Sequence, residues 1–202
     1  MSAAVEFWFD FASPYSYLAA MRIAALADAA GVGVTWRAFL LGPIFAAQGW
    51  NDSPFNIYPP KGRYMWRDLE RICARDGLSL RRSSVFPRNG LLAARVACRF
   101  AGEDWVPAFC RAVFCANFAD DREIAEPAVV LGCLAEAGVA GEAVIAAAQS
   151  EDGKAGLRAV VEQAKARGLF GAPSFVVGDE VFWGNDRLED ALDWARRRGS
   201  SG

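Results

Sequence analysis

The stretch VEFWFDFASPYS, residues 5–16, decides the fold class of this 202-residue chain. Apolar residues recur at every second position in its first half: Val5, Phe7, Phe9 and Phe11. A period of two predicts a strand with one buried face. Ser13 and Pro14 then supply a helix N-cap and a first helical residue, so the strand should lead directly into a helix.

The following residues complete a strand–helix–strand unit. The helix extends over residues 17–30 and ends at Gly31 and Gly33, and residues 34–41 form a second apolar strand. Connections of this kind are right-handed and join parallel strands.

The last fifty residues supply a helix, a hairpin and a final helix. The helices are predicted at 153–168 and about 187–198, and the hairpin strands at 174–177 and 181–183. Strand–helix–strand followed by helix–hairpin–helix is the thioredoxin order of elements, so the expected class is an α/β, thioredoxin-like fold.

The middle of the chain is Ala-rich and has helical periodicity without a clear strand. The predicted helices cover residues 62–75, 88–101, 104–118, 121–138 and 140–149. We therefore expect a discontinuous thioredoxin-like domain of residues 1–46 and 151–202, interrupted after its second strand by a helical insertion domain of residues 47–150.

Charge and hydropathy exclude several classes of protein. The net charge of −2, from 22 basic and 24 acidic residues, argues against a nucleic-acid binder. No signal peptide and no apolar run of about 18 residues is present, so neither export nor membrane insertion is expected. The expected location is cytoplasmic.

The absence of histidine excludes Ser-His-Asp and Cys-His activation of a nucleophile, and His-containing zinc sites. The cysteines are Cys73, Cys98, Cys110, Cys115 and Cys133. None is two residues from another, so we interpret them as small buried thiols and expect no metal. We therefore expect the nucleophile to come from outside the chain.

Ser13 and Ser16 stand at the strand–helix junction where thioredoxin-type redox proteins have their two cysteines. A hydroxyl cannot perform dithiol–disulfide exchange. A serine at a helix N-terminus can, however, donate a hydrogen bond to a thiolate that a ligand brings in. The simpler interpretation, a capped helix start, is nearly as well supported by this segment alone.

Two further turns are candidates for ligand binding. In the thioredoxin order, Pro173 of Gly171-Ala172-Pro173 is expected to be cis and to face the start of the first helix, which leaves the backbone of Ala172 free for a peptide-like ligand. Asp186 and Glu189 have the spacing of a capping box, and Asp186 could also hold the ammonium of a small peptide.

Cations and aromatic residues are interleaved at the start of the helix predicted over residues 62–75. Lys61, Arg63 and Arg67 lie among Tyr64 and Trp66, which would suit an anionic aromatic ligand. A solvated helix face with buried aromatic residues is an equally good interpretation. We expect a ligand cleft between the start of the first helix at Ser13 and the Ala172-Pro173 turn. Helical spacing separates Lys61 and Tyr64, which we expect to face this cleft, from Arg63 and Arg67, which we expect on the surface.

These motifs together resemble the 2-hydroxychromene-2-carboxylate isomerases, which belong with the kappa-class glutathione transferases and, more remotely, the periplasmic disulfide oxidoreductases. The resemblance runs the whole length and rests on FDFASPYSYL (9–18), KGRYM (61–65) with Asp68-Leu69, GAP (171–173) and GNDRL (184–188).

The resemblance implies glutathione as the cofactor and a role for each matching residue. Ser13 would contact the glutathione sulfur, Ala172 before the cis-proline Pro173 would pair with the cysteinyl backbone, and Asp186 would hold the γ-glutamyl end. Lys61 and a loop asparagine, Asn51 or preferably Asn56, would also contact glutathione, and Asn185 stands where the kappa class tends to have serine. Apart from the resemblance, we expect Lys61, Tyr64 and Tyr15 to bind the second substrate.

The activity implied is isomerisation of 2-hydroxychromene-2-carboxylate or a related aromatic-degradation intermediate through reversible thiol addition. The expected partners are a small aromatic carboxylate and a second copy of the chain in a homodimer, with neither nucleic acid nor membrane. Two alternatives remain open: a glutathione transferase or peroxidase acting on another electrophile, and a non-catalytic thiol- or peptide-binding module.

Overall fold

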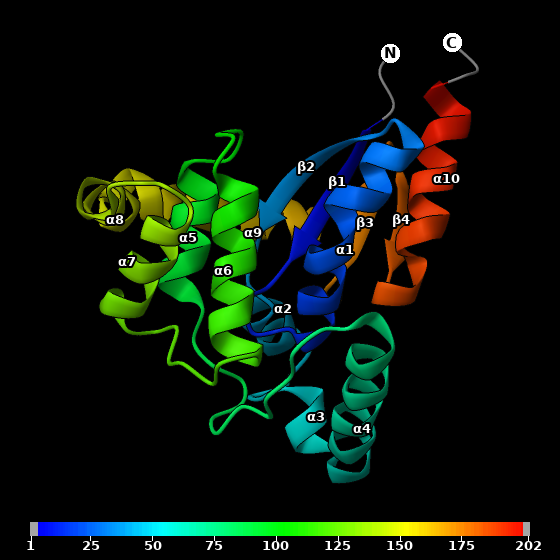
Figure 1. The fold of residues 1–202 in the computed structure, drawn as a ribbon, viewed down its shortest axis with the longest axis horizontal. Helices are drawn as coiled ribbons and strands as arrows, with labels where there is room; N and C mark the ends of the chain where they lie inside the picture. Colours follow the sequence, from blue (N-terminus) through cyan, green and yellow to red (C-terminus); the bar gives the residue numbers. More distant parts are fainter. Residues whose placement is uncertain (1–3, 200–202) are drawn as a thin grey trace.

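A four-stranded sheet in the order β2-β1-β3-β4 forms the centre of the protein, which a computed structural model describes over residues 4–199 (Figure 1). The strands are β1 (Ala4–Phe9), β2 (Gly33–Ala38), β3 (Ser174–Val177) and β4 (Glu180–Trp183). β1 pairs in parallel with β2 and antiparallel with β3, and β3 pairs antiparallel with β4. The predicted parallel pair and hairpin are confirmed. Residues 1–3 and 200–202 of the predicted thioredoxin-like domain lie outside the described residues.

Helices surround the sheet and fill the interval between β2 and β3. They are α1 (Pro14–Ala30), α2 (Gly42–Ala47), α3 (Pro54–Ile57), α4 (Pro59–Asp76), α5 (Leu91–Arg99), α6 (Val106–Phe118), α7 (Pro127–Glu136), α8 (Gly141–Gln149), α9 (Glu151–Ala166) and α10 (Leu188–Gly199), with a short 3-10 turn at Asn185–Arg187. The short helices α2 and α3 were not predicted, because four to six residues give too little periodicity to recognise.

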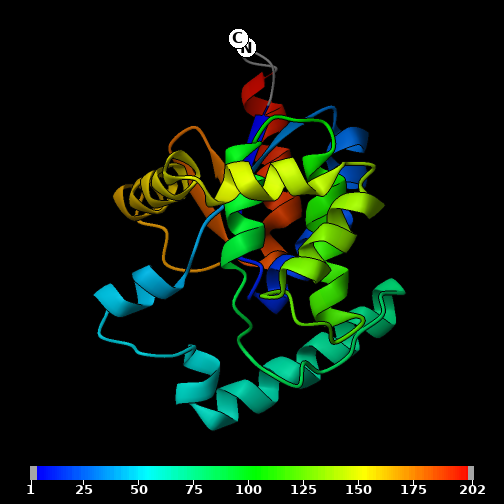
Figure 2. The same cartoon turned by 90° about the vertical axis from the view of Figure 1, so that its left-hand side faces the viewer.

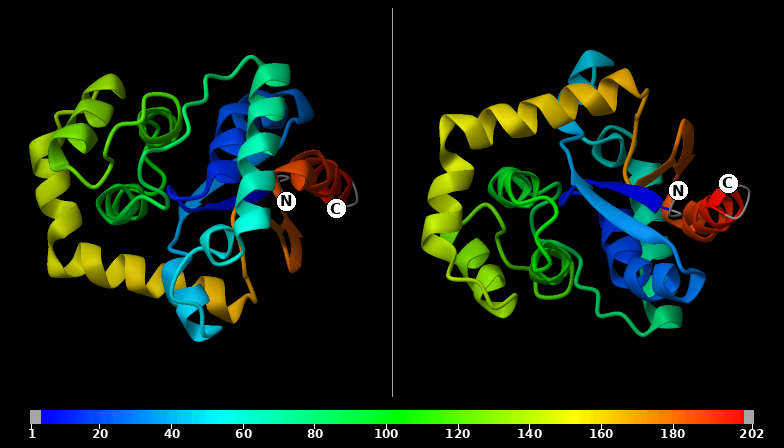
Figure 3. Two further views of the ribbon diagram at one scale, coloured as in Figure 1. Left: turned by 90° about the horizontal axis from the view of Figure 1, so that it is seen from below. Right: turned by 90° about the horizontal axis from the view of Figure 1, so that it is seen from above.

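The two faces of the sheet are covered by different helices, with α1 and α10 on one side and α9 on the other (Figure 3). The alternation along β1 explains this arrangement. Phe7 stacks on Phe175 in the core that includes α1 and α10, whereas Trp8 points the opposite way and packs with Val161 of α9. Both faces of β1 are therefore covered by helices, as expected for a central strand of an α/β sheet.

Helices α5 to α8 lie beside the sheet, and α3 and α4 lie across one end of it (Figures 1 and 2). Aromatic contacts of Phe114 with Phe9 and Phe11 join α6 to the end of β1. Gly90, the N-cap of α5, approaches the same place, and a Cβ there would lie 2.8 Å from the Cβ of Phe11. The helical segment therefore packs directly behind the loop that leads to Ser13.

The predicted helix over residues 121–138 was too long. In the structure α7 begins only at Pro127, and Asp121 has a left-handed conformation with φ of 57°. A proline is favourable in the first turn but cannot continue a helix from preceding residues. Residues 119–126 form an irregular connection instead.

Candidate active site

Ser13 lies at the start of α1, where it caps the helix and contacts a loop from the other end of the chain. Its Oγ accepts a hydrogen bond from the backbone N–H of Ser16 at 3.2 Å and donates one to the carbonyl oxygen of Ala172 at 2.9 Å. The residue is buried, and the hydroxyl of Ser16 is also buried but has no hydrogen-bond partner among residues 4–199. An anionic group beside Ser13 would meet a hydroxyl donor and the positive end of a 17-residue helix.

The Ala172–Pro173 peptide bond is cis, as predicted. The carbonyl of Pro173 accepts a hydrogen bond from the N–H of Gly184, while the N–H of Ala172 makes no hydrogen bond with any residue in the 4–199 range. Gly171 comes just before it, and a Cβ at this position would clash with the indole of Trp183 in its present orientation. The hydrogen bond from Gly184 and the contact with Trp183 therefore fix the cis-proline loop against β4. The N–H of Ala172 stays available for a ligand.

Asp186 and Asn185 occupy the turn before α10. The Asp186 side chain is 73% exposed and pairs with Arg187 at 3.1 Å. The predicted capping box is wrong, because Glu189 forms an ion pair with Arg22 at 2.8 Å, and Gly184, not Asp186, is the N-cap of the turn. Asn185 is buried, and its side-chain oxygen accepts a hydrogen bond from Arg22, so this amide supports the turn from behind.

Tyr15 lies between this turn and α4. Its hydroxyl donates to Oδ2 of Asp68 at 2.9 Å. Burial raises the pKa of Tyr15, with further contributions from Asp68, Tyr64 and Asp186. The groups that add to this rise belong to two different elements, Asp68 and Tyr64 to α4 and Asp186 to the turn before α10.

The face of α4 near Tyr15 carries Lys61, Tyr64 and Asp68. The Lys61 ammonium lies 5.6 Å from the ring centre of Phe55, whose ring is 6.3 Å from that of Tyr15. Lys61 and Tyr64 are both exposed. The ring of Phe55 therefore lies close to both the exposed amine of Lys61 and the ring of Tyr15, in the first turn of α1.

The other cations and the other aromatic residue of segment 61–67 have different roles. Arg63 and Arg67 are exposed, and Arg67 pairs with Glu70 at 2.7 Å. Trp66 is buried in the core, with Arg82 stacked over its ring at 5.5 Å. For Trp66, the structure favours the interpretation as a core residue.

The two candidate asparagines differ in how much of their amide is already used. The amide of Asn56 donates to both carboxylate oxygens of Asp52 and to the carbonyl of Phe86. The side chain of Asn51 is exposed and makes no hydrogen bond with any described residue. Asn56 therefore ties α3 to the loop around residue 86, and Asn51 has the freer amide.

Sequence reasoning missed Asp10, which shapes the Ser13 loop. Its buried carboxylate accepts hydrogen bonds from the N–H groups of Ala12 at 2.9 Å and Leu41 at 2.7 Å. Burial raises the pKa of Asp10, and the two backbone hydrogen bonds oppose that shift. A polar residue directly after a buried strand was the available signal.

The five cysteines are buried or half-buried and unpaired. Burial raises the pKa of every one of these thiols, to about 11 for Cys73 and Cys133. Within residues 4–199 no cluster of potential ligands could hold a metal ion, and no helix is both long and apolar enough to cross a membrane.

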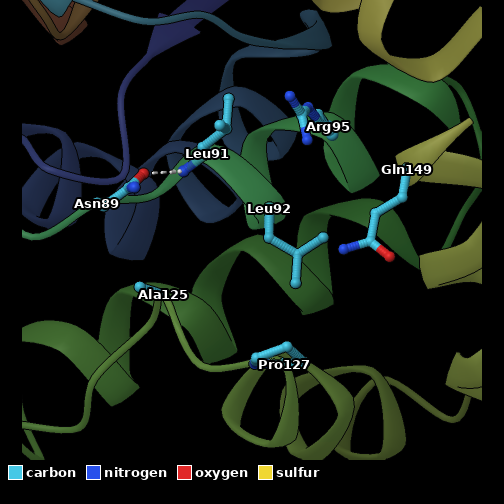
Figure 4. Close-up of a pocket in the computed structure, with 7 residues that line it drawn as sticks. All are labelled: Asn89, Leu91, Leu92, Arg95, Ala125, Pro127 and Gln149. Carbon is cyan, nitrogen blue, oxygen red and sulfur yellow. Dashed lines mark hydrogen bonds between the residues drawn. The ribbon is translucent and has the colours of Figure 1, made fainter. Parts of the chain in front are cut away.

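A cavity of about 150 Å³ lies away from these residues, between α5, α7 and α8 (Figure 4). Its lining consists of Asn89, Leu91, Leu92, Arg95, Ala125, Pro127 and Gln149. None of the residues predicted from the sequence to bind a ligand contributes to it.

Comparison with known proteins agrees with this arrangement. The model of the DsbA-like thioredoxin domain family matches residues 4–193. The 2-hydroxychromene-2-carboxylate isomerase of Sphingobium xenophagum is 32% identical, over 94% of this chain and 96% of its own length. The enzyme of the same name from Pseudomonas putida is 33% identical, over 91% and 90%. A solved 2-hydroxychromene-2-carboxylate isomerase superposes with a TM-score of 0.85 at 27% identity, covering 98% of both chains. The chain therefore belongs to the DsbA-like thioredoxin family and, within it, to the family of 2-hydroxychromene-2-carboxylate isomerases.

Proposed function

We propose that this protein isomerises 2-hydroxychromene-2-carboxylate, or a related intermediate of aromatic degradation, with glutathione as its cofactor. The observation that carries the proposal is the pairing of Ser13 Oγ with the carbonyl of Ala172, beside a cis-proline, in a chain with no histidine and no cysteine at the helix start. This pairing supports a site that holds a peptide-like thiol without a redox pair of its own.

The residues around Ser13 fit glutathione. The free N–H of Ala172 can pair with the cysteinyl backbone, and the exposed carboxylate of Asp186 can pair with the γ-glutamyl ammonium. Lys61 and Asn51 or Asn56 are further candidates on the opposite side of Tyr15. When bound, glutathione would supply a thiolate for reversible addition to the conjugated substrate.

The task of Ser13 would be to keep that sulfur ionised. A thiol with a pKa of about 8.5 is about 3% ionised at pH 7, and lowering the pKa by about two units makes it roughly three-quarters ionised. Two units correspond to about 2.7 kcal/mol. A helix N-terminus and one charge-assisted hydrogen bond can together supply this energy. The Ser13 hydroxyl would turn its hydrogen from Ala172 toward the sulfur.

The second substrate would approach from the α4 side. Lys61 and Tyr64 are exposed there, and Phe55 and Tyr15 supply aromatic surface. A cation next to aromatic rings suits an aromatic carboxylate. Lys61 would hold the carboxylate, and Tyr15 and Tyr64 would contact the ring.

The test is incubation of the purified protein with glutathione and 2-hydroxychromene-2-carboxylate while the ultraviolet spectrum is followed. We expect a change toward the isomer that requires both protein and glutathione, with no net consumption of the thiol. Conjugation of a chlorinated nitrobenzene, assayed in parallel, separates this activity from that of a glutathione transferase. Glutathione binding without either reaction would instead favour the non-catalytic thiol-binding module.

A further inference from the structure

The carbonyl of Phe11, two residues before Ser13, is held by a side chain from the helical segment. Nδ2 of Asn117, in the last turn of α6, donates a hydrogen bond to this oxygen at 2.9 Å. Asn117 is only 1% exposed and Phe11 is fully buried, so water does not compete for the bond. The loop that carries Ser13 is thereby attached to a helix more than 100 residues away in sequence.

Arg88 fixes the orientation of the Asn117 amide. One guanidinium nitrogen, Nη1, donates to both the side-chain oxygen and the backbone carbonyl of Asn117, each at 3.1 Å. With the amide oxygen directed at Arg88, the NH₂ group of Asn117 is the part left to face Phe11. The Arg88 side chain is 2% exposed, and its charge is balanced by Asp121 and Glu123.

We propose that Asn117, oriented by Arg88, is a positioning residue for Ser13. Asp10 holds the same loop from its other side, through the N–H groups of Ala12 and Leu41. The two attachments together fix the turn between β1 and α1, and hence the direction of the Ser13 side chain and of the first N–H groups of α1. The effect on the rate of isomerisation rests on the proposed function, whereas the effect on the position of the Ser13 side chain does not.

The position of this turn matters because hydrogen bonds to a thiolate depend steeply on geometry. Functional groups must be held within about 0.5 Å and 10–20° of the productive arrangement. Loss of the Asn117 donor leaves the buried Phe11 carbonyl without a partner. The turn would then shift to find one, and the site would lose stabilisation of the thiolate while the thioredoxin-like sheet stays intact.

The test uses Ser13→Cys as a reporter that does not depend on substrate. The five native thiols have raised pKa values, so alkylation by iodoacetamide between pH 5 and 8 reports on the introduced thiol. The informative combination is Ser13→Cys with Asn117→Leu, which has a similar shape and adds no charge that could itself shift the pKa.

Ser83→Ala is the matched control. The Ser83 hydroxyl is buried and donates to the backbone carbonyl of Asn117 at 3.3 Å, but has no bond to the Ser13 loop. We expect Asn117→Leu to raise the pKa of the introduced thiol by about one unit, which lowers alkylation about tenfold at any pH below that pKa. Ser83→Ala should leave the thiol pKa and the alkylation rate unchanged, although it lowers the melting temperature.

Arg88→Lys is the second variant, since it keeps the positive charge, but a single amine on a differently shaped side chain cannot replace all the guanidinium bonds to Asn117, Ser84 and Asp121. Arg88→Lys should raise the thiol pKa as Asn117→Leu does, but by a smaller amount. If Asn117→Leu does not fold, Arg88→Lys alone tests the positioning role of Asn117.

The second measurement is made on the enzyme with its native Ser13. There Asn117→Leu should lower kcat about tenfold with KM nearly unchanged. An unchanged thiol pKa in both variants, or an equal shift in Ser83→Ala, overturns the proposal. A protein without isomerase activity would refute the proposed function, and the thiol measurement would still decide the positioning role.

Discussion

The hydroxyl of Ser13 and the carbonyl oxygen of Ala172 are joined by a 2.9 Å hydrogen bond, although 159 positions separate the two residues in the sequence. This bond brings the start of α1 against the cis-proline loop. It also places the hydroxyl of Ser13 next to the residue whose N–H makes no hydrogen bond within residues 4–199, and these are the two groups proposed to contact a peptide-like thiol.

Ser13→Ala should keep the fold and lose most of the glutathione-dependent activity. Loss of the N-cap costs about 1 kcal/mol of stability, and loss of the hydroxyl removes the proposed donor to the thiolate. The measurement is the isomerisation rate together with thermal unfolding. Ser150→Ala is the control, since Ser150 caps α9 in the same way, through the N–H of Gly153 at 3.1 Å. A Ser13→Ala protein with wild-type turnover would exclude the donor role.

Asp186→Asn should weaken glutathione binding by about 1.5 kcal/mol or more, the usual scale of a hydrogen bond to a charged group. Asp190→Asn is a matched control, because Asp190 is also exposed and also pairs with Arg187, at 2.8 Å. Titration calorimetry measures both affinities. An unchanged affinity for Asp186→Asn would place the γ-glutamyl end elsewhere, and equal losses would assign the effect to Arg187.

Lys61→Met should raise KM for the carboxylated substrate much more than for a neutral halogenated nitrobenzene. The expected reason is loss of the cation beside Phe55 and Tyr15. Arg63→Met serves as the control, since Arg63 is exposed two positions away on a different face of α4. Steady-state kinetics with both substrates make the comparison. An equal rise for both would mean that Lys61 serves glutathione alone.

The free energy of unfolding should fall as the pH rises from about 9 to about 11. Burial raises the pKa of Cys73 and Cys133 from 9.0 to about 11, and it also raises the pKa values of Tyr15 and Tyr17. In this pH range the unfolded chain releases protons that the folded chain keeps. The contribution of these groups to the free energy of unfolding is therefore fully present below pH 9 and is lost as the pH rises above it. Urea unfolding under reducing conditions, repeated across this range, tests the prediction. Cys73→Ala should give a shallower decline, and a stability that stayed constant would contradict the burial of these thiols.

Local patterns in the sequence were enough to predict the sheet and the start of α1. The period of two in β1, the Ser13-Pro14 pair and the glycines after α1 each depend on residues within a few positions. The cis-proline could be predicted because the order of elements identified its place in the fold. The isomerase family, which the comparisons confirm, could be recognised from four motifs in four separate segments of the chain.

Contacts between distant residues could not be predicted in the same way. The spacing of Asp186 and Glu189 was that of a capping box, but Glu189 pairs with Arg22 of α1 instead. Asn117 lies in an apolar stretch with nothing to indicate that it bonds to the Phe11 carbonyl. A local pattern states what a residue can do, and the tertiary structure decides which partner it meets.

The order of the strands also determines when the site can form during synthesis. Ser13 leaves the ribosome early, whereas Ala172, Pro173 and the β3–β4 hairpin follow all the helices from α2 to α9. β1 can pair with β2 once residue 38 has emerged, but its other edge stays open until residue 177 is available. A chain interrupted anywhere in the helical segment would therefore carry Ser13 with no binding site around it. It would also leave one edge of β1 unpaired, and an unpaired strand edge is a template for pairing with other chains until β3 is available.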